Sequence, residues 1–142
     1  MKNVIIVERI PSVEEYLTLR KAINWKIIDE KTCEKGLQGS LYSVCAELDN
    51  EIIGMARVIG DSGLYFYIQD VIVLPQYQKK GIGKLLMVKI MKYLEENLSP
   101  LTVVGLMASK GKESFYEKFG FTKRPNERRG HGMFRIWTDN NQ

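Results

Sequence analysis

Histidine, cysteine and long apolar runs are scarce in this chain, which has one histidine and two cysteines among its 142 residues. Cys33 and Cys45 have neither the spacing of metal ligands nor the density of a disulfide scaffold, so we expect reduced thiols, no metal site and a cytoplasmic location. The apolar run Val4 to Val7 ends at Glu8 and Arg9, which is too short for a signal peptide. No run approaches the length needed to span a membrane, so we expect no membrane partner.

Linkers and repeats are also missing, and the length suits a single domain over residues 1–142 with a core that needs no disulfide. The net charge of +4 could indicate a nucleic-acid partner. Acidic residues are interspersed throughout, however, and the lysines cluster in one glycine-bearing segment. An anionic cofactor explains the positive excess as well, and we expect no nucleic acid to be bound. A second basic cluster, residues 123–129, is more typical of a solvated loop.

The glycine-bearing segment lies between the apolar run Val71 to Leu74 and a helical pattern that starts at Lys84, and it reads Gln78-Lys79-Lys80-Gly81-Ile82-Gly83. A strand that turns directly into a helix leaves backbone N–H groups unpaired at the positive end of the helix dipole. The two glycines allow a ligand to come close, and the lysines add positive charge. The segment therefore predicts a pyrophosphate site. It has neither the Walker spacing nor the three glycines of the dinucleotide fingerprint.

Hydrophobic periodicity predicts an α/β (α+β mixed) fold with a central mixed sheet of about six to seven strands and helices on both faces. Residues 64–74 are almost continuously apolar, which is typical of a central strand buried on both faces. The expected strands are 4–9, 41–48, 51–59, 64–74, 101–107, one at Phe121 and one at 133–137. The expected helices are 13–23, 29–37, 82–98 and 113–119, and the third should bury Ile82, Leu85, Leu86, Ile90 and Leu94.

The spacing Q-x-x-G-x-G after a long apolar strand, with the motif Phe115-Tyr116-Glu117-Lys118-Phe119-Gly120-Phe121 downstream, resembles the GNAT superfamily of acyl-CoA-dependent N-acetyltransferases. The resemblance extends from Val4 to Trp137. It implies direct transfer of the acetyl group of acetyl-CoA to a primary amine of a small molecule or peptide, in a ternary complex. By the same resemblance, the coenzyme A pyrophosphate is held by Gln78, Lys79, Lys80, Gly81, Ile82, Gly83 and Lys84.

The resemblance also assigns residues near the thioester. In the family, the strand before the loop carries a bulge and diverges from the next strand, and its backbone binds the pantetheine arm; those backbone groups fall here at Val71 and Val73. Tyr116 matches the family tyrosine that protonates the leaving thiolate as a general acid. A phenol with a pKa of about 10 is protonated at neutral pH and can donate to a thiolate with a pKa of about 8.5. Ser109 stands where many members have a pantetheine-binding asparagine.

The general base is open. Asp70 could act through a water molecule, although a strand aspartate is more often a structural hydrogen-bond acceptor. His131 lies between two glycines in a late loop and has no ligand-like partner nearby in the sequence. We favour a proton that leaves through solvent, with no single decisive base.

Two other functions remain open at this stage: an acyl-CoA-binding sensor without catalysis, and a nucleic-acid-binding module that uses the same lysines. Substrate recognition is expected from residues 23–41 and from the late loop 124–133, where an arginine cluster would suit an acidic substrate. The sequence does not identify the amine or the acyl chain, and it leaves a homodimer open.

Overall fold

The computed structural model describes residues 3–138. The chain forms two compact units, which meet in sequence between Leu106 and Met107. The first unit contains the sheet, three α-helices and one 3₁₀ helix, and the second contains one short α-helix. Each unit is described by itself below.

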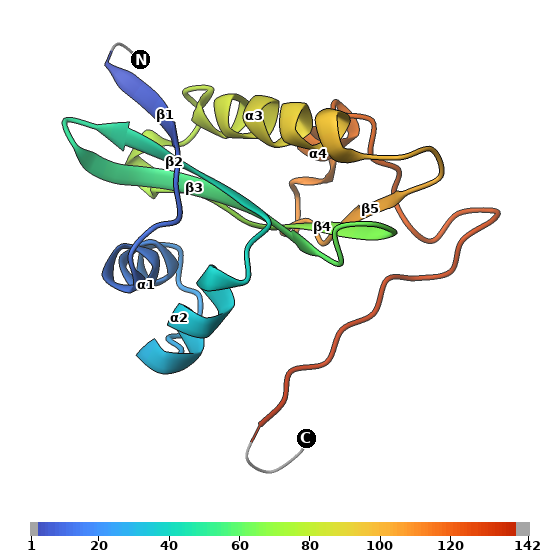
Figure 1. The fold of residues 1–142 in the computed structure, drawn as a ribbon, viewed down its shortest axis with the longest axis horizontal. Helices are drawn as coiled ribbons and strands as arrows, with labels where there is room; N and C mark the ends of the chain where they lie inside the picture. The colour runs from blue at the N-terminus through green and yellow to red at the C-terminus, as the bar shows by residue number, and fades with distance from the viewer. Residues whose placement is uncertain (1–2, 139–142) are drawn as a thin grey trace. The chain divides into compact units, whose positions relative to one another are not determined.

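The first unit is built on one mixed sheet whose five strands lie in the order of the sequence (Figure 1). The first four strands pair antiparallel, and the last pairs parallel with its neighbour. This confirms the mixed sheet, with fewer strands than the six to seven expected. The strands are β1 (Val4–Glu8), β2 (Tyr42–Leu48), β3 (Glu51–Gly60), β4 (Tyr65–Val73) and β5 (Val103–Leu106).

Helices cover both faces of this sheet, as the sequence predicted (Figure 1). On one face lie α1 (Val13–Ala22) and α2 (Glu30–Gln38), and on the other lies α3 (Ile82–Asn97). The start of α1 follows from its sequence, because Ser12 Oγ accepts from the Glu15 amide and the Glu15 carboxylate accepts from the Ser12 amide. The short 3₁₀ helix η1 (Pro75–Tyr77) joins β4 to the glycine-bearing loop.

The core has two layers, one on each side of the sheet. On the α1 and α2 side, Leu19 and Leu37 pack with Met55 and Ile72 from the strands. On the other side, α3 buries four of the five side chains expected, but Leu85 is 46% exposed and Met87 is buried instead. The prediction for this helix was therefore wrong at one residue. The buried face includes Met87, which follows Leu86, and not Leu85, which precedes it.

From Phe66 to Val73 every residue of β4 is buried or half-buried. Ile68 pairs with Val58, and Ile72 pairs with Met55 beyond an irregularity in the ladder. Met55 and Val58 are three positions apart on β3 and therefore point to opposite faces of the sheet, so the buried side chains of Ile68 and Ile72 also lie on opposite faces. This confirms the expectation that β4 is buried on both faces.

The second unit contains α4 (Glu113–Glu117), and Gly120 follows it with a φ of +92°, which suits a glycine at a helix end. The strands expected at Phe121 and at residues 133–137 are not formed; the described residues after Leu106 contain no strand. Met133 and Phe134 are exposed. Apolar and aromatic residues give a segment the propensity for a strand, but a strand also requires a neighbour that pairs with its backbone.

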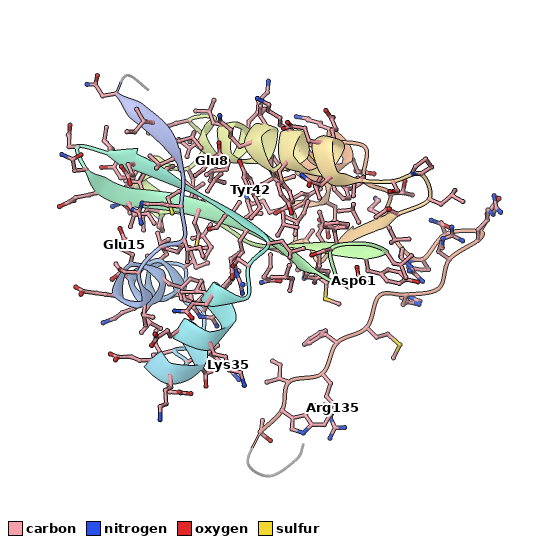
Figure 2. The ribbon with its side chains drawn as sticks, viewed as in Figure 1. Glu8, Glu15, Lys35, Tyr42, Asp61 and Arg135 are labelled. Carbon is pink, nitrogen blue, oxygen red and sulfur yellow. The ribbon has the colours of Figure 1, made fainter. Side chains whose placement is uncertain are left out.

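An ion pair between Arg9 and Glu15 makes the stability of the fold depend on pH. Glu15 lies in the first turn of α1 (Figure 2), and both of its carboxylate oxygens accept from the Arg9 guanidinium at 2.8 and 2.9 Å. The hydrogen bond from Arg9 lowers the pKa of Glu15 from 4.5 to about 2. Because the folded pKa is depressed, the stabilisation is fully present above pH 4.5 and is lost as the pH falls toward 2.

We expect Glu15→Gln to lower the free energy of unfolding by roughly 1–3 kcal/mol at pH 7 and by much less near pH 2. Glutamine can keep the capping contact with Ser12, so the variant isolates the charge. Urea unfolding at pH 7, 4, 3 and 2 measures the effect, with the exposed neighbour variant Glu14→Gln as control. A constant difference between Glu15→Gln and the unmutated protein across this range would contradict the assignment.

Candidate active site

A β-bulge interrupts the middle of the pairing between β3 and β4. Arg57 pairs with Gln69 and Met55 pairs with Ile72, so two residues of β4, Asp70 and Val71, face the single residue between Met55 and Arg57. Asp70 has a φ of +56°, in the left-handed region that aspartate tolerates better than most residues. The bulge that the resemblance implied therefore lies at Asp70 and Val71.

Beyond the bulge, β4 has no recorded pairing with β5. The parallel ladder runs from Tyr65 with Val103 to Ile68 with Leu106 and contains no later pair. Val71 and Val73 therefore lie on a part of β4 that pairs only with β3 among the described strands. One acceptor position there is used, because Gln78 Nε2 donates to the Val73 carbonyl at 2.9 Å. A divergent strand end offers backbone groups to an extended ligand.

The glycine-bearing loop begins directly after η1 and ends in α3. Lys79 and Gly81 have φ values of +63° and +84°, so the chain turns sharply twice before the helix starts. Leu85 donates to the Gly81 carbonyl in the first hydrogen bond of α3, which leaves the amides of Ile82, Gly83 and Lys84 ahead of that bond.

The space beside Gly81 is open. A Cβ added there would meet no atom within 4 Å apart from its chain neighbours. The side chains of Lys79, Lys80 and Lys84 are exposed around it. Forward-pointing amides, a helix N-terminus and three cations together suit a pyrophosphate group.

The Asp70 side chain points away from solvent into a hydrogen-bonded cluster. Asp70 is 2% exposed, and its carboxylate accepts from Arg57 Nε at 2.7 Å, from Tyr16 Oη at 3.0 Å and from Gln69 Nε2 at 3.3 Å. A base that works through water needs an oxygen that water can reach. These contacts favour the structural alternative for Asp70.

In the second unit, Tyr116 lies in α4 and is half-buried. Its ring packs edge-on against Phe115, with ring centroids 5.0 Å apart. Burial raises the pKa of the Tyr116 phenol above 10, so the phenol keeps its proton at neutral pH. Ser109 is exposed at the preceding turn, where its carbonyl accepts from the Lys112 amide. The roles of Tyr116 and Ser109 stay predictions.

Comparison with known proteins identifies the family. Residues 12–136 match the family described as Acetyltransferase (GNAT) domain. This chain belongs to the GNAT acetyltransferase family. The match spans both units of the chain.

Two solved structures resemble this GNAT chain over most of its length. One is a protein of unknown function from meticillin-resistant Staphylococcus aureus, described further as "Probable Acetyltransferase"; it is 36% identical with a TM-score of 0.87, and the match covers 94% of this chain and 99% of that one. The other is a GNAT family acetyltransferase from Streptococcus pneumoniae TIGR4, at 28% identity and a TM-score of 0.79, covering 94% and 97%.

Curated relatives carry similar descriptions. An uncharacterized N-acetyltransferase of Porphyra purpurea is 34% identical over 56% of this chain and 44% of its own length. Another, from Prochlorococcus marinus, is 31% identical over 78% of this chain and 63% of its own. The GNAT chain thus spans about half the length of several curated relatives it matches.

Neither thiol of the GNAT chain is suited to act as a nucleophile. Cys33 and Cys45 are both free and buried. Burial raises the pKa of Cys45 to about 12 and also raises that of Cys33. A thiol must ionise to attack a carbonyl, so these two favour a mechanism without an acyl-cysteine.

Within the described range 3–138, no cluster of three His, Cys, Asp or Glu side chains is suited to a metal ion. The helices of this range are also too short or too polar to cross a lipid bilayer. His131 is exposed and lies outside the helices and strands.

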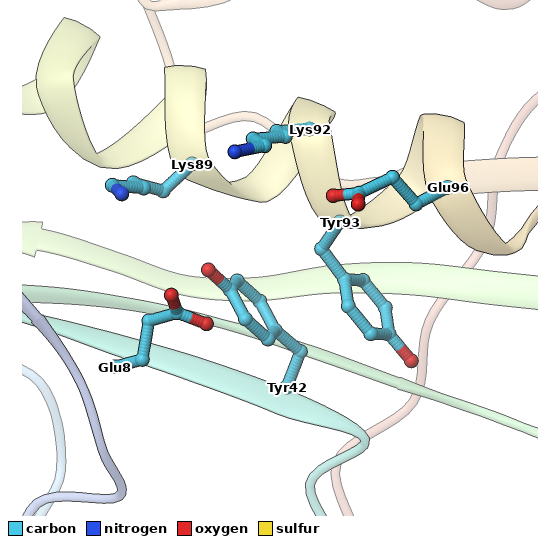
Figure 3. Close-up of a pocket in the computed structure, with 6 residues that line it drawn as sticks. All are labelled: Glu8, Tyr42, Lys89, Lys92, Tyr93 and Glu96. Carbon is cyan, nitrogen blue, oxygen red and sulfur yellow. The ribbon is translucent and has the colours of Figure 1, made fainter.

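A separate groove of about 280 Å³ lies between α3 and the strands β1 and β2 (Figure 3). The Tyr42 and Tyr93 rings stack in it, 4.4 Å apart and nearly parallel. Burial and the Glu8 carboxylate raise the pKa of Tyr42 to about 12. None of the predicted cofactor residues lines this groove. Its remaining lining residues are Lys89, Lys92 and Glu96.

The segments expected to recognise the amine are packed or folded on themselves. Trp25 packs against the core beside α1, with the Arg20 guanidinium 5.4 Å from its ring. In the late loop, Arg124 Nε donates to the Gly130 carbonyl at 2.7 Å, and Asn126 Oδ1 accepts from two amides of the loop. Glu127, Arg128 and Arg129 remain exposed.

Sequence reasoning missed Tyr16 and Arg57, which contact Asp70. A signal was present: Arg57 is a charged residue in the interior of one strand, and Asp70 is a charged residue in the interior of the next. Opposite charges buried on neighbouring strands are expected to pair, because an unpaired buried charge is costly.

Proposed function

We propose that this chain transfers the acetyl group of acetyl-CoA to a primary amine of a small molecule or peptide. The observation that carries the proposal is the loop at residues 78–84, whose leading amides, left-handed Gly81 and three exposed lysines suit a diphosphate. Membership of the GNAT family supports the acetyl-transfer chemistry.

In this proposal, acetyl-CoA is a substrate that the first unit holds at two places. The amides from Lys79 to Lys84 bind its pyrophosphate, and the backbone of Val71 and Val73 binds its pantetheine arm where β4 has no β5 partner. Hydrogen bonds to backbone groups fix the direction of the arm without requiring particular side chains. Ser109 adds a hydroxyl contact.

Chemistry then requires a neutral amine and a proton for the departing thiolate. The amine nitrogen bonds to the acetyl carbon, the carbon–sulfur bond breaks, and the Tyr116 phenol gives its proton to the sulfur. The amine loses a proton to solvent, and the Tyr116 phenolate takes a proton from solvent, so the phenol is restored. We assign no single base, because the Asp70 carboxylate is occupied by three donors.

Titration calorimetry at low salt tests the first part of the proposal. We expect acetyl-CoA to bind with measurable heat and to raise the melting temperature, because a ligand that binds only the folded state stabilises it. A panel of primary amines, assayed by release of free coenzyme A, then identifies the acceptor class. Absence of both heat and thermal shift would refute the assignment of the cofactor.

A competition experiment distinguishes the proposed function from the nucleic-acid alternative. A module that uses these lysines for RNA or DNA would bind it in a salt-dependent manner that excess coenzyme A fails to displace. If the same lysines form the acetyl-CoA site, excess coenzyme A should displace any nucleic acid bound to them.

A further inference from the structure

The β4 bulge forces Asp70 into a strained backbone conformation, and something must hold it there. Its φ of +56° is unusual for a residue other than glycine, and such conformations persist when the surroundings determine them. The Asp70 side chain is the part of the bulge most deeply buried on the α1 side. We therefore expect the contacts of this side chain to fix the conformation of the bulge.

The closest contact comes from the facing strand at the edge of the bulge. Arg57 is paired with Gln69, the residue just before the bulge, and its Nε donates to Asp70 Oδ2 at 2.7 Å. The side chains of Arg57 and Asp70 are 12% and 1% exposed, respectively. Charge-assisted hydrogen bonds of this kind are short and directional. The pair thus spans the place where the β3–β4 ladder shifts register.

The helices on that face hold both partners. Arg57 Nη1 also donates to the Gly36 carbonyl and to Ser40 Oγ, both at 3.2 Å, at the end of α2. Tyr16 Oη of α1 donates to Asp70 Oδ2 and accepts from Arg20 Nη1 at 3.1 Å. The cluster therefore ties α1, α2, β3 and β4 together at the bulge, on the face that α1 and α2 cover (Figure 1).

Stability alone is a weak reason for such a cluster. Removing an ion pair from water is costly, and apolar side chains of similar volume often serve a fold as well or better. What apolar side chains lack is direction, and a bulge that must present backbone groups at one angle needs it.

We propose that Asp70 is a positioning residue that, with Arg57 and Tyr16, fixes the β4 bulge and so sets the angle at which Val71 and Val73 meet the pantetheine arm. The inference rests on the proposed function. It replaces a direct role for Asp70 in proton transfer with an indirect role in binding. The loop at residues 78–84 has its own backbone geometry, so pyrophosphate binding should not depend on this cluster.

The variant Asp70→Asn tests the proposal with little other disturbance. Asparagine has the same shape and also tolerates a positive φ, but it removes the negative charge that Arg57 and Tyr16 contact. Calorimetry should compare coenzyme A, which has the pantetheine arm, with ADP, which has the adenosine and the diphosphate but no pantetheine arm. We expect the Kd of coenzyme A to rise about 10-fold and that of ADP to change less than 2-fold.

Two further variants complete the test. Tyr16→Phe removes one hydrogen bond to Asp70 and should shift the coenzyme A affinity in the same direction by a smaller factor; it also serves if Asp70→Asn does not fold. Glu47→Gln removes a partly buried ion pair with Arg9, 2.8 Å long, on the same sheet, and should change neither affinity.

The outcomes are distinct. If wild-type protein binds both ligands and the Asp70 and Tyr16 variants weaken neither, or weaken both equally, the positioning role is wrong while the proposed function stands. If wild-type protein binds neither ligand, the proposed function fails and this inference fails with it. Selective loss of coenzyme A affinity supports both.

Discussion

Tyr116→Phe should lower kcat for acetyl transfer by about 100-fold or more, while the Kd of acetyl-CoA changes less than 2-fold, since general acid catalysis typically contributes 10²–10⁴-fold. The substitution removes only the phenol oxygen and keeps the ring that packs against Phe115. Without that proton, the thiolate must leave unprotonated or take a proton from water. Stopped assays of coenzyme A release under saturating substrates measure the effect.

A matched control is Tyr93→Phe, which removes a phenol oxygen from the stacked pair in the α3 groove (Figure 3). Its kcat should equal that of the wild type. Because burial raises the pKa of Tyr116 above 10, the phenol stays protonated below pH 10, and the wild-type kcat should not fall in that range through its ionisation. Equal kcat values for the two variants would mean that Tyr116 is not the general acid, whereas the sensor alternative predicts acetyl-CoA binding with no transfer even by the wild-type protein.

Features encoded by a few neighbouring residues could be predicted from the sequence. Ser12 begins α1 through a capping box, and Asp49 and Asn50 turn β2 into β3 with φ values of +50° and +65°. The left-handed Gly81 before α3 belongs to the same group. In each case the residue type and its immediate neighbours determine the backbone, so the rest of the fold has little influence.

The cluster around Asp70 depends on residues far apart in the sequence. Tyr16 is 54 positions away from Asp70, and Arg57 is 13. A bulge adds one residue to a strand without changing its composition, so the pattern of apolar residues does not reveal it. The resemblance to the family implied a bulge before the loop. The residues that hold it required the structure.

The segment at residues 133–137 shows the opposite error. Its apolar and aromatic residues predict a strand, yet the described part of the chain forms none there. Local propensity is a weak guide for β-structure, because stability comes from pairing and burial against a neighbouring strand. The strand count was therefore overestimated, while the mixed sheet was confirmed, with β5 parallel to β4.

A second large effect is expected at the loop of residues 78–84, where one added negative charge should weaken the binding of acetyl-CoA. Gly81→Asp should raise the Kd of acetyl-CoA by about 100-fold or more, because like unit charges roughly 5 Å apart repel by about 3 kcal/mol at an effective dielectric constant of about 20. The open space beside Gly81 accommodates the new side chain, so the effect should be electrostatic.

Gly81→Asn is the matched control for this charge. Asparagine has the same size as aspartate, and both tolerate the φ of +84° better than other residues with a side chain. We expect it to raise the Kd by about 10-fold or less, through partial filling of the site, and to melt within a few degrees of Gly81→Asp. The difference between the two Kd values should shrink as ionic strength rises, since salt screens exposed charges. Equal affinities for the aspartate and asparagine variants would mean that the diphosphate does not lie at this loop.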